Sequence, residues 1–430
     1  MNDRFLRILV ILPMYGGSLP IGRYCCTALR EIGHTVRCFE SPAMYPAFTG
    51  LKELQLPPEN ILKIENSFIH IVSQAILAHV ESFEPHLVLA MAQAPVDKNI
   101  LLRIKNSGIR TAMWFVEDYS IFNYWKLYAP LYDIFAVIQK EPFITELRKI
   151  GQENSLYLPL AADPSFHKPI HLTNDEQREY GADIAFLGAG YPNRRLAFRH
   201  LAGRNFKIWG SDWEGESLLS KNIQRNGQRI SSEDSVRIYN ATKININLHS
   251  SVHTEQLVSH GDFVNPRTFE LAAMKAFQLV DERSLMGELF GSDELVTFGD
   301  MEDCCRKIDF FLSHPVEREQ YREKAFVRVL KEHTYVHRMR TLVSSIESSV
   351  GWGMPIGVET HQDPNSYQDE LSHVMESFLL ETGLGPHSSL ETAVSSLKAR
   401  KGPLSEAETA VLFLDAWKRQ YLHNDKRSSR

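Results

Sequence analysis

Short apolar, β-rich runs alternate with amphipathic helical patterns along the first 160 residues of the chain. The apolar runs predict strands at Ile8–Leu12, Thr35–Phe39, His86–Ala92, Arg110–Phe115, Asp133–Ile138 and Ser155–Leu160. The amphipathic stretches predict helices at Pro20–Ile32, Glu59–Ser82, Lys98–Asn106 and Pro142–Ile150. Repeated strand–helix–strand units indicate a parallel sheet with helices on both faces, so residues 1–160 are expected to form a Rossmann-like α/β domain.

The alternation stops in a polar, proline-rich stretch, residues 161–182, which we interpret as a linker. It then begins again, with strands predicted at Asp183–Leu187, Phe206–Trp209, Lys243–Leu248, Phe277–Val280 and Glu294–Phe298. Helices are predicted at Asn193–Ala202, Ser232–Asn240, Pro266–Met274, Leu285–Phe290, Glu302–Ser313, Pro315–Glu332 and Tyr335–Ser349. Residues 183–350 should therefore form a second Rossmann-like domain that faces the first across a cleft.

Residues 351–430 begin as a loop-rich stretch and end in two amphipathic helical patterns, which predict a helical extension. In the last pattern Ala410, Leu414, Trp417 and Tyr421 fall on one helical face. This apolar face is expected to dock either on its own domain or on a partner subunit, and the second alternative would make the protein a homodimer.

Composition narrows the class of protein. The chain of 430 residues exceeds what one core usually serves, and its apolar fraction of 43% and charged fraction of 23% are ordinary for a globular protein. A net charge of −6 offers no general attraction to nucleic acid or anionic lipid. The N-terminal apolar run is too short to span a bilayer, so we expect no transmembrane segment and a cytoplasmic location.

The five cysteines include two adjacent pairs, Cys25–Cys26 and Cys304–Cys305, and lack the spacing of a disulfide framework or a zinc site. We expect reduced thiols, mostly in the core. His249, His253 and His260 lie on a predicted loop and are expected to be ordinary polar residues instead of metal ligands.

Residues suited to binding a ligand are concentrated in the segment Asp262–Glu282, which joins a helix start to a buried strand. Asn265 can cap the helix and the following proline suits its first turn, so the backbone N–H groups near Arg267 and Thr268 could meet a diphosphate. Glu270, one turn further on, could accept hydrogen bonds from the two hydroxyls of a ribose. Alternatively, this is an ordinary helix start in which Arg267 and Glu270 pair with each other.

A second phosphate-binding feature follows the first strand of the second domain. Gly188 and Gly190 form a flexible loop, and Arg194 and Arg195 stand at the start of the next helix. The alternative is two solvated arginines after an ordinary turn. Trp209 could form a wall for a nucleobase, although a tryptophan at a strand end is as often part of the core.

Candidate residues also lie in the first domain, on the side of the cleft where the acceptor of a transferred group would bind. Gly16 and Gly17 follow the first strand and let the backbone pass close to a ligand, but their loop is no GxGxxG motif and NAD binding is disfavoured. Glu117 and Asp118 follow the strand Arg110–Phe115 and could take a proton from an acceptor hydroxyl, or form a solvated turn. In addition, Trp114 and Tyr119 could stack on a sugar, although a structural role is equally consistent with the sequence.

Several segments together resemble a known family. FLGAGYPNRR, IWGSDW, YNATKININLH, NPRTFELAAMKAFQLVDE and HTYVHR, in this order and spacing, are similar to the spore maturation protein CgeB-like glycosyltransferase family, across about residues 85–345. The linker LPLAADPSFHKP resembles that of GT-B glycosyltransferases of the glycogen-synthase-like group, and Asp262 with Glu270 keeps a D-x7-E spacing where that group has E-x7-E.

The resemblance implies a GT-B fold with the nucleotide sugar held mainly by the second domain. By position, Glu270 would hold the ribose, Arg267 and the helix N-terminus the diphosphate, and Asp262 part of the sugar. Lys275 stands where the family more often has glycine, and Asp262 is one methylene shorter than the usual glutamate. His333 and His337, in HTYVHR, are interpreted as packing or capping residues.

We therefore expect a glycosyltransferase that moves a sugar from a nucleotide-diphosphate sugar to a hydroxyl on a protein, glycan or lipid. No DxD motif is present to hold a divalent ion, so we expect neither a metal nor another cofactor. Two alternatives stay open: a nucleotide-sugar epimerase on the same fold, and a non-catalytic assembly subunit.

Overall fold

The computed structural model describes residues 5–258, 261–352 and 390–399, with positions 402, 408, 409 and 412. The chain divides into two compact units, Met1–Ile356 and Gly357–Arg430. The second unit contributes one described helix, α16 (Leu390–Ala399). The four residues predicted to share an apolar face in the extension lie outside the described residues, and the predicted domain boundaries within the first unit stay predictions.

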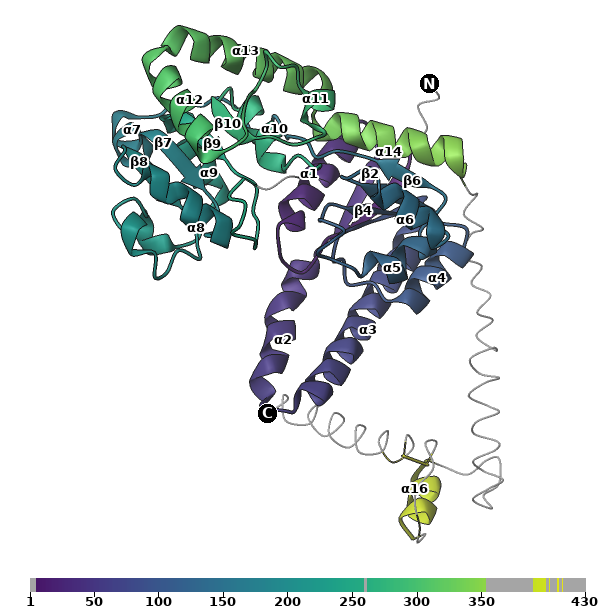
Figure 1. The fold of residues 1–430 in the computed structure, drawn as a ribbon. Helices are drawn as coiled ribbons and strands as arrows, with labels where there is room; N and C mark the ends of the chain where they lie inside the picture. The colour runs from purple at the N-terminus through teal and green to yellow at the C-terminus, as the bar shows by residue number, and fades with distance from the viewer. Residues whose placement is uncertain are drawn as a thin grey trace. The chain divides into compact units, whose positions relative to one another are not determined.

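A six-stranded parallel sheet forms from the first series of apolar runs (Figure 1). Its strands are β1 (Arg7–Ile11), β2 (Thr35–Phe39), β3 (Leu87–Met91), β4 (Arg110–Phe115), β5 (Ile134–Val137) and β6 (Ser155–Tyr157), in the order β2-β1-β3-β4-β5-β6. Its helices are α1 (Ser18–Glu31), α2 (Tyr45–Gly50), α3 (Pro58–Phe83), α4 (Lys98–Asn106), α5 (Trp125–Tyr128) and α6 (Phe143–Lys149). A Rossmann-like sheet was predicted here, and its strands run through a buried core as parallel strands do.

The second series forms a five-stranded parallel sheet in the order β11-β10-β9-β7-β8. Its strands are β7 (Ala182–Leu187), β8 (Phe206–Trp209), β9 (Thr242–Asn247), β10 (Gln278–Asp281) and β11 (Val296–Phe298). The helices are α7 (Asn174–Tyr180), α8 (Pro192–Phe198), α9 (Ser232–Ala241), α10 (Pro266–Ala273), α11 (Met286–Leu289), α12 (Met301–Ser313), α13 (Pro315–Glu332) and α14 (Tyr335–Ser349).

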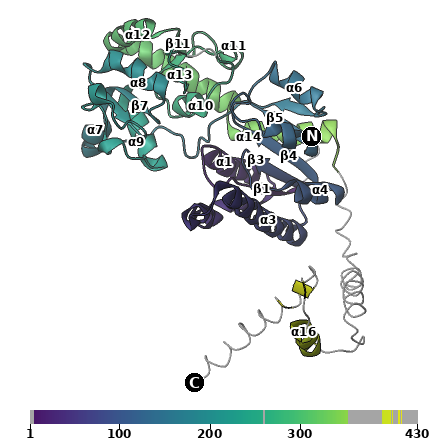
Figure 2. The same cartoon turned by 60° about the horizontal axis from the view of Figure 1, so that its bottom comes forward.

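Each face of the six-stranded sheet buries its own core because side chains alternate along each strand. Ile8 and Val10 point to the face covered by α1 and α14, and Leu9 and Ile11 point to the face covered by α3 and α4 (Figure 2). No helix in the described ranges is long and apolar enough to cross a membrane.

Helix α14 follows the second sheet in sequence but packs on α1 of the first (Figure 1). Two contacts fix it at its start: Ala162 pairs with Thr334 in an isolated parallel bridge, and Arg338 donates to the Leu160 carbonyl from Nη2 at 3.0 Å. The return of the chain to the first sheet ties both halves of this unit together.

Both sheets share one strand order, in which the first strand lies between the second and the third. The chain therefore reverses direction between β1 and β3 and between β7 and β9. Open α/β sheets bind ligands outside the carboxyl ends of the strands at such a point. The loops after these four strands are thus the places to look for a site.

One expectation was wrong, and one segment holds a helix that was not predicted. The predicted linker contains α7, which begins with a capping box formed by Thr173 and Glu176. Cys26 on α1 and Cys38 on β2 form a disulfide, so the expectation of reduced cysteines fails for this pair. Cys25, Cys304 and Cys305 are free, and the first two are buried as expected.

Candidate functional site

The N-terminus of α10 lies beside the end of β9, on one side of the reversal point in the second sheet. Asn265 has extended backbone angles, and its side-chain oxygen accepts the Thr268 N–H at 3.1 Å, as predicted for a cap. Thr268 is fully buried, and its hydroxyl accepts a hydrogen bond from Asn247 Nδ2 at 2.9 Å. The Thr268 N–H and hydroxyl are used inside the protein, so the free N–H group that the first turn presents to an anion is that of Arg267. The predicted phosphate contact at Thr268 is therefore corrected.

The Arg267 side chain lies beside the aromatic rings of Phe186 and Tyr239. Its Nε donates to the Tyr239 hydroxyl at 2.6 Å, and no carboxylate in the described part of the chain forms an ion pair with it. Burial, and then the charge of Arg267, lower the pKa of Arg194 to about 9. Two neighbouring cations beside a helix N-terminus create a potential that favours an anion.

Arg194 and Arg195 hold a loop in place, which corrects the prediction that both contact a phosphate. Arg194 is buried, and its guanidinium donates to the carbonyls of Leu248 and Ala189 at 2.8–3.1 Å. Arg195 donates from Nε to the Gly190 carbonyl at 2.8 Å, and from Nη1 to a second loop carbonyl. Their donors are largely used by the protein itself, so Arg194 contributes to the site mainly through its charge.

The loop Gly188–Gly190 packs closely against the backbone that follows β8. Gly188 has φ +156°, and a Cβ on Gly190 would lie 2.2 Å from the Asp212 carbonyl oxygen. Both glycines are therefore required by the packing of the loop itself. Donor contact by this loop stays a prediction.

The two tryptophans predicted to contact ligands are buried, so both predictions are corrected. Trp209 is 2% exposed, and its ring packs against Tyr180 and Arg225. Trp114 has no exposed surface and donates its indole N–H to the Leu158 carbonyl at 3.1 Å. A ring without exposed faces cannot stack on a base or a sugar.

Glu270 lies one turn into α10 with its side chain 20% exposed. Its Oε1 is 3.7 Å from Nε2 of His167 in the linker, and the same nitrogen is 3.4 Å from the hydroxyl of Tyr24 on α1. Burial, and then the charge of Glu270, raise the pKa of Tyr24 above its ordinary value, so this phenol keeps its proton. Glu270 does not pair with Arg267, the alternative considered from sequence, because Arg267 points to Tyr239.

A buried network of hydrogen bonds lies behind the cap and fixes the position of the α10 N-terminus. The Asp281 carboxylate accepts a hydrogen bond from His249 Nδ1 at 2.6 Å, and His249 Nε2 accepts the Asn265 N–H at 3.0 Å. Burial lowers the pKa of His249, in agreement with an accepting, unprotonated Nε2. His249 is thus a positioning residue and no ordinary loop histidine, which corrects the expectation from sequence.

His260 lies outside the described residues. Among those that are described, no group of three or more His, Cys, Asp or Glu side chains is arranged to hold a metal ion. His333 and His337 are confirmed as packing and capping residues. His333 Nε2 donates to the Leu289 carbonyl at 2.7 Å, and His337 completes a capping box with Thr334.

Asp262 contacts the first domain through a residue that the sequence did not single out. Its Oδ1 accepts a hydrogen bond from Gln139 Nε2 at 2.9 Å, and Gln139 Oε1 accepts the Tyr119 N–H at 3.0 Å. The Tyr119 ring stacks on Phe143 with centroids 4.5 Å apart. Burial, and then the charge of Asp262, raise the pKa of Tyr119, which places this acceptor-side candidate near Asp262.

Of the two candidate bases, Glu117 has the more suitable surroundings. Its Oε2 accepts a hydrogen bond from Tyr124 at 2.8 Å, its Oε1 accepts one from Gln93 Nε2, and burial raises its pKa. Asp118 instead accepts both the N–H and the hydroxyl of Ser120, at 2.9 and 2.7 Å, and so closes a local turn. The raised pKa of Glu117 suits it to accept a proton, whereas the Asp118 carboxylate is used to close its turn.

Gln93 and Gly16 meet at the reversal point of the first sheet. Gln93 follows β3 with φ +63°, a conformation that residues other than glycine seldom adopt. Gly16 has φ +98°, and a Cβ at this position would lie 3.8 Å from Gln93 Oε1. Gly17 precedes α1 with φ −70° and open space where its Cβ would be, so it needs neither close packing nor an unusual backbone.

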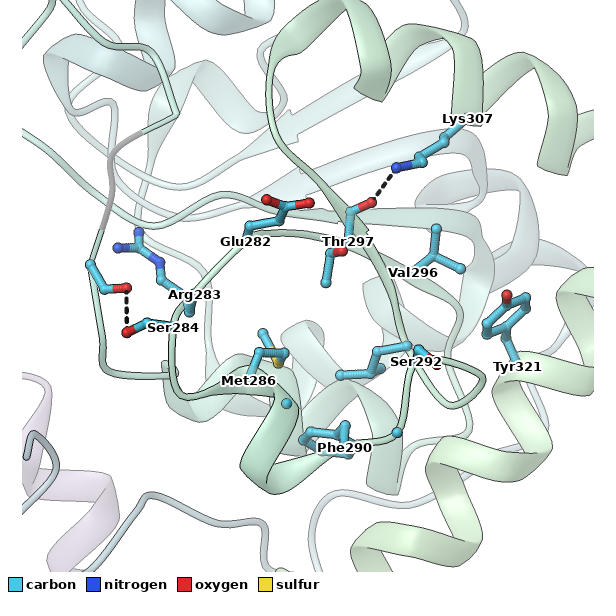
Figure 3. Close-up of a pocket in the computed structure, with 14 residues that line it drawn as sticks. Glu282, Arg283, Ser284, Met286, Phe290, Ser292, Val296, Thr297, Lys307 and Tyr321 are labelled. Carbon is cyan, nitrogen blue, oxygen red and sulfur yellow. Dashed lines mark hydrogen bonds between the residues drawn. The ribbon is translucent and has the colours of Figure 1, made fainter.

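A pocket of about 660 Å³ lies beside the edge strand β11, between the segment after β10 and helices α12 and α13 (Figure 3). None of the predicted donor-binding residues lines it. Its two basic side chains are already engaged, because Arg283 pairs with Asp281 at 2.8 Å and Lys307 with Asp303 at 2.6 Å. Its engaged side chains therefore leave less free positive charge for an anion than Arg267 does at the α10 N-terminus.

Comparison with known proteins finds a family model and a curated relative that match part of the chain. Residues 194–344 match the family model described as glycosyl transferase-like. The spore protein CgeB of Bacillus subtilis (strain 168) is 24% identical over 255 residues, which cover 57% of this chain and 77% of CgeB.

Solved structures have the same fold. A glycosyltransferase from Rickettsia africae ESF-5 aligns with a TM-score of 0.56 at 14% identity, over 81% of this chain and 99% of that one. Anabaena HepE, solved with UDP and glucose, aligns with a TM-score of 0.53 at 11% identity, over 80% and 100%. The chain is therefore similar to CgeB and, over residues 194–344, to the glycosyl transferase-like family, and its two Rossmann-like sheets have the GT-B fold.

Proposed function

We propose that the protein transfers a sugar from a nucleoside-diphosphate sugar to a hydroxyl acceptor, with the donor bound at the N-terminus of α10. The observation that carries the proposal is the position and charge of Arg267. It lies beside a second cation, next to a helix N-terminus, and forms no ion pair with a carboxylate in the described ranges. A diphosphate would supply the missing negative charge.

Glu270 would accept hydrogen bonds from the ribose hydroxyls, because its partly exposed carboxylate lies one turn beyond Arg267 on the same helix. Asp262 would contact the sugar. As the bond between sugar and diphosphate breaks, negative charge grows on the leaving diphosphate, and Arg267 and the helix dipole would stabilise it. We propose that this stabilisation replaces a divalent ion.

Glu117 would take the proton of the acceptor hydroxyl. Its raised pKa suits a general base, and Tyr124 and Gln93 fix the orientation of its carboxylate. A carboxylate oxygen has two lone pairs, so Oε2 can accept from Tyr124 and still receive a proton. For the acceptor we propose only a hydroxyl of a protein, glycan or lipid, with the reaction in the cytoplasm.

Binding of the donor can be tested by calorimetry with UDP, GDP and TDP, UDP first because HepE was solved with it. Glu270→Ala should weaken the binding of the preferred nucleotide about 10-fold or more, since each hydrogen bond to a charged group contributes roughly 1.5–3 kcal/mol. Glu302→Gln, on a side chain 85% exposed on α12, is the matched control and should change nothing. Unchanged affinity in Glu270→Ala would contradict the ribose assignment.

The products distinguish the alternatives. A transferase releases the nucleoside diphosphate as the sugar leaves, whereas an epimerase returns an isomeric nucleotide sugar without releasing it. A non-catalytic subunit would bind the nucleotide and give neither product. We expect release of the diphosphate, and slower release in Glu117→Gln than in Asp118→Asn.

A further inference from the structure

Gln139 lies just beyond the carboxyl end of β5, where the first domain meets Asp262. The side chain is 4% exposed, although amide side chains are usually found at the surface. Burial of an amide is costly unless its donors and acceptors are used, so a buried glutamine is normally held for its hydrogen bonds.

Both ends of the Gln139 amide are used, and the partners fix its orientation. Tyr119 N–H can only donate, so the atom facing it at 3.0 Å is Oε1, and Nε2 therefore faces the Asp262 carboxylate at 2.9 Å. One side chain thus connects the loop that carries Glu117 to the residue proposed to contact the sugar. In the described part of the chain this bond uses Asp262 Oδ1, and Oδ2 is left for a ligand hydroxyl.

We propose that Gln139 is a positioning residue that fixes the Asp262 carboxylate against the acceptor loop, so that the donor sugar is held in line with the acceptor. The inference rests on the donor site proposed at α10. It adds a residue whose effect should be confined to the sugar, because in the described ranges the Gln139 side chain forms its hydrogen bonds with Tyr119 and Asp262 and with no residue of α10.

A neighbouring contact allows this role to be separated from simple attachment of one domain to the other. Lys140, the next residue, forms an ion pair with Glu288 in the second domain. Their side chains are 37% and 49% exposed, and in the described ranges neither side chain forms a hydrogen bond or an ion pair with Tyr119 or Asp262. Lys140→Ala thus removes a contact between the same two domains without altering the amide bridge.

The experiment compares the affinities for a nucleoside diphosphate and for its sugar, using UDP with UDP-glucose, GDP with GDP-mannose and TDP with TDP-glucose. Calorimetry gives the sugar factor, which is the affinity for the nucleotide sugar divided by the affinity for the preferred nucleotide alone. Gln139→Ala should reduce this factor about 3- to 10-fold, which corresponds to the loss of roughly one hydrogen bond. The affinity for the diphosphate alone should stay within about twofold, and Lys140→Ala should change neither quantity.

Two further variants test the coupling itself. In an Asp262→Ala background, Gln139→Ala should have no additional effect on the sugar factor, because the partner is already absent. Gln139→Glu places a carboxylate against Asp262 and should impair sugar binding at pH 8. Sugar binding should recover near pH 5, where a shared proton restores a hydrogen bond between the two carboxyl groups. A side chain that only fills space would show no such recovery.

The outcomes separate this inference from the proposal on which it rests. If UDP, GDP or TDP binds and Gln139→Ala leaves the sugar factor unchanged, or Lys140→Ala reduces it equally, the positioning role is wrong and the donor site stands. If the wild-type protein binds none of the six ligands, the donor site is wrong and the positioning role falls with it.

Discussion

Lys275 illustrates how one residue can look like a functional departure and prove to be a structural one. It stands where the family more often has glycine, which put close approach of a ligand in doubt. In the structure Lys275 follows the C-terminus of α10 with φ +53°, a left-handed conformation that favours glycine. Its ammonium pairs with Glu319 and Glu323 on α13. It thus lies at the opposite end of the helix from Asn265 and does not enter the donor site.

This geometry predicts an unusual order of stability among variants of Lys275. Lys275→Gly loses two partly exposed ion pairs but relieves the left-handed strain, whereas Lys275→Ala loses the pairs and keeps the strain. We expect the glycine variant to be more stable than the alanine variant by about 1 kcal/mol, measured by urea unfolding. Glu323→Ala removes one of the two ion pairs and leaves Lys275 in place, so it measures the contribution of that pair to the free energy of unfolding. Alanine more stable than glycine would refute the strain argument.

For single residues, hydrogen bonds to neighbours in the chain could be predicted from the sequence, whereas the burial of a side chain could not. The capping of α10 by Asn265 depends on the residues next to it and followed from sequence. The roles assigned to Arg194 and Trp209 depended on whether their side chains reach solvent, which is decided by residues far away in the chain. Gln139 was missed for the same reason, because Asp262, its partner, is 123 positions distant.

At the scale of elements, the strands and the longer helices were predicted, and helix α7 was not. Six elements have the predicted bounds: β2, β4, β8, α4, α13 and α14. Helix α7 was assigned to the linker because, of its residues, only Tyr180 is buried, so it carries no apolar stripe from which a helix could be predicted. Its capping box was present in the sequence and was the available signal.

The junction between α13 and α14 has a pH dependence that follows from His333. Its Nδ1 accepts a hydrogen bond from Arg338 Nη2 at 2.9 Å, while Nε2 donates to the Leu289 carbonyl. Burial, and then the charge of Arg338, lower its pKa from 6.5 to about 4. The neutral imidazole is thus the form that fits the fold, since a proton on Nδ1 would point at a guanidinium.

The sign of the effect follows from proton uptake. Between about pH 6.5 and pH 4 the unfolded chain binds a proton at His333 that the folded chain does not, so the free energy of unfolding falls as the pH is lowered. The loss attributable to His333 should reach about 3 kcal/mol near pH 4 and be absent above pH 7. His333→Gln keeps one donor and one acceptor but cannot titrate. Urea unfolding of both proteins from pH 7.5 to pH 4.5 should give a shallower pH dependence for the variant, and parallel curves would disprove the assignment.

At the scale of the molecule, two Rossmann-like domains followed from the alternation of strands and helices, but the strand order did not. Strand order depends on pairings such as β1 with β3, which join residues about 80 positions apart, and no local pattern encodes them. The order nevertheless determines which of the candidate site residues meet, because the reversal points put Gly16 beside Gln93 and the α10 N-terminus beside β9. The predicted diphosphate and ribose contacts, Arg267 and Glu270, lie on one helix, whereas the acceptor-side candidates come from the ends of separate strands.

The extension after residue 356 should be dispensable for donor binding. Both sheets, and all the residues proposed to bind the nucleotide and the sugar, belong to the unit Met1–Ile356. A chain ending at Ile356 also keeps the carbonyls of Val350 and Gly351, which accept hydrogen bonds from Arg110 at 2.9 and 2.6 Å. The end of α14 therefore stays attached to the first sheet, and we expect a cooperatively folded protein.

Calorimetry on this shortened chain should give the affinity of the full chain for the preferred nucleotide within about twofold, because no contact of the proposed site is removed. Sedimentation of the two chains then tests the predicted homodimer. If the apolar face of the extension forms the subunit contact, the full chain sediments as a dimer and the shortened chain as a monomer. Equal oligomeric states would remove the extension as the dimer contact, and a loss of affinity beyond about tenfold would place part of the donor site after residue 356.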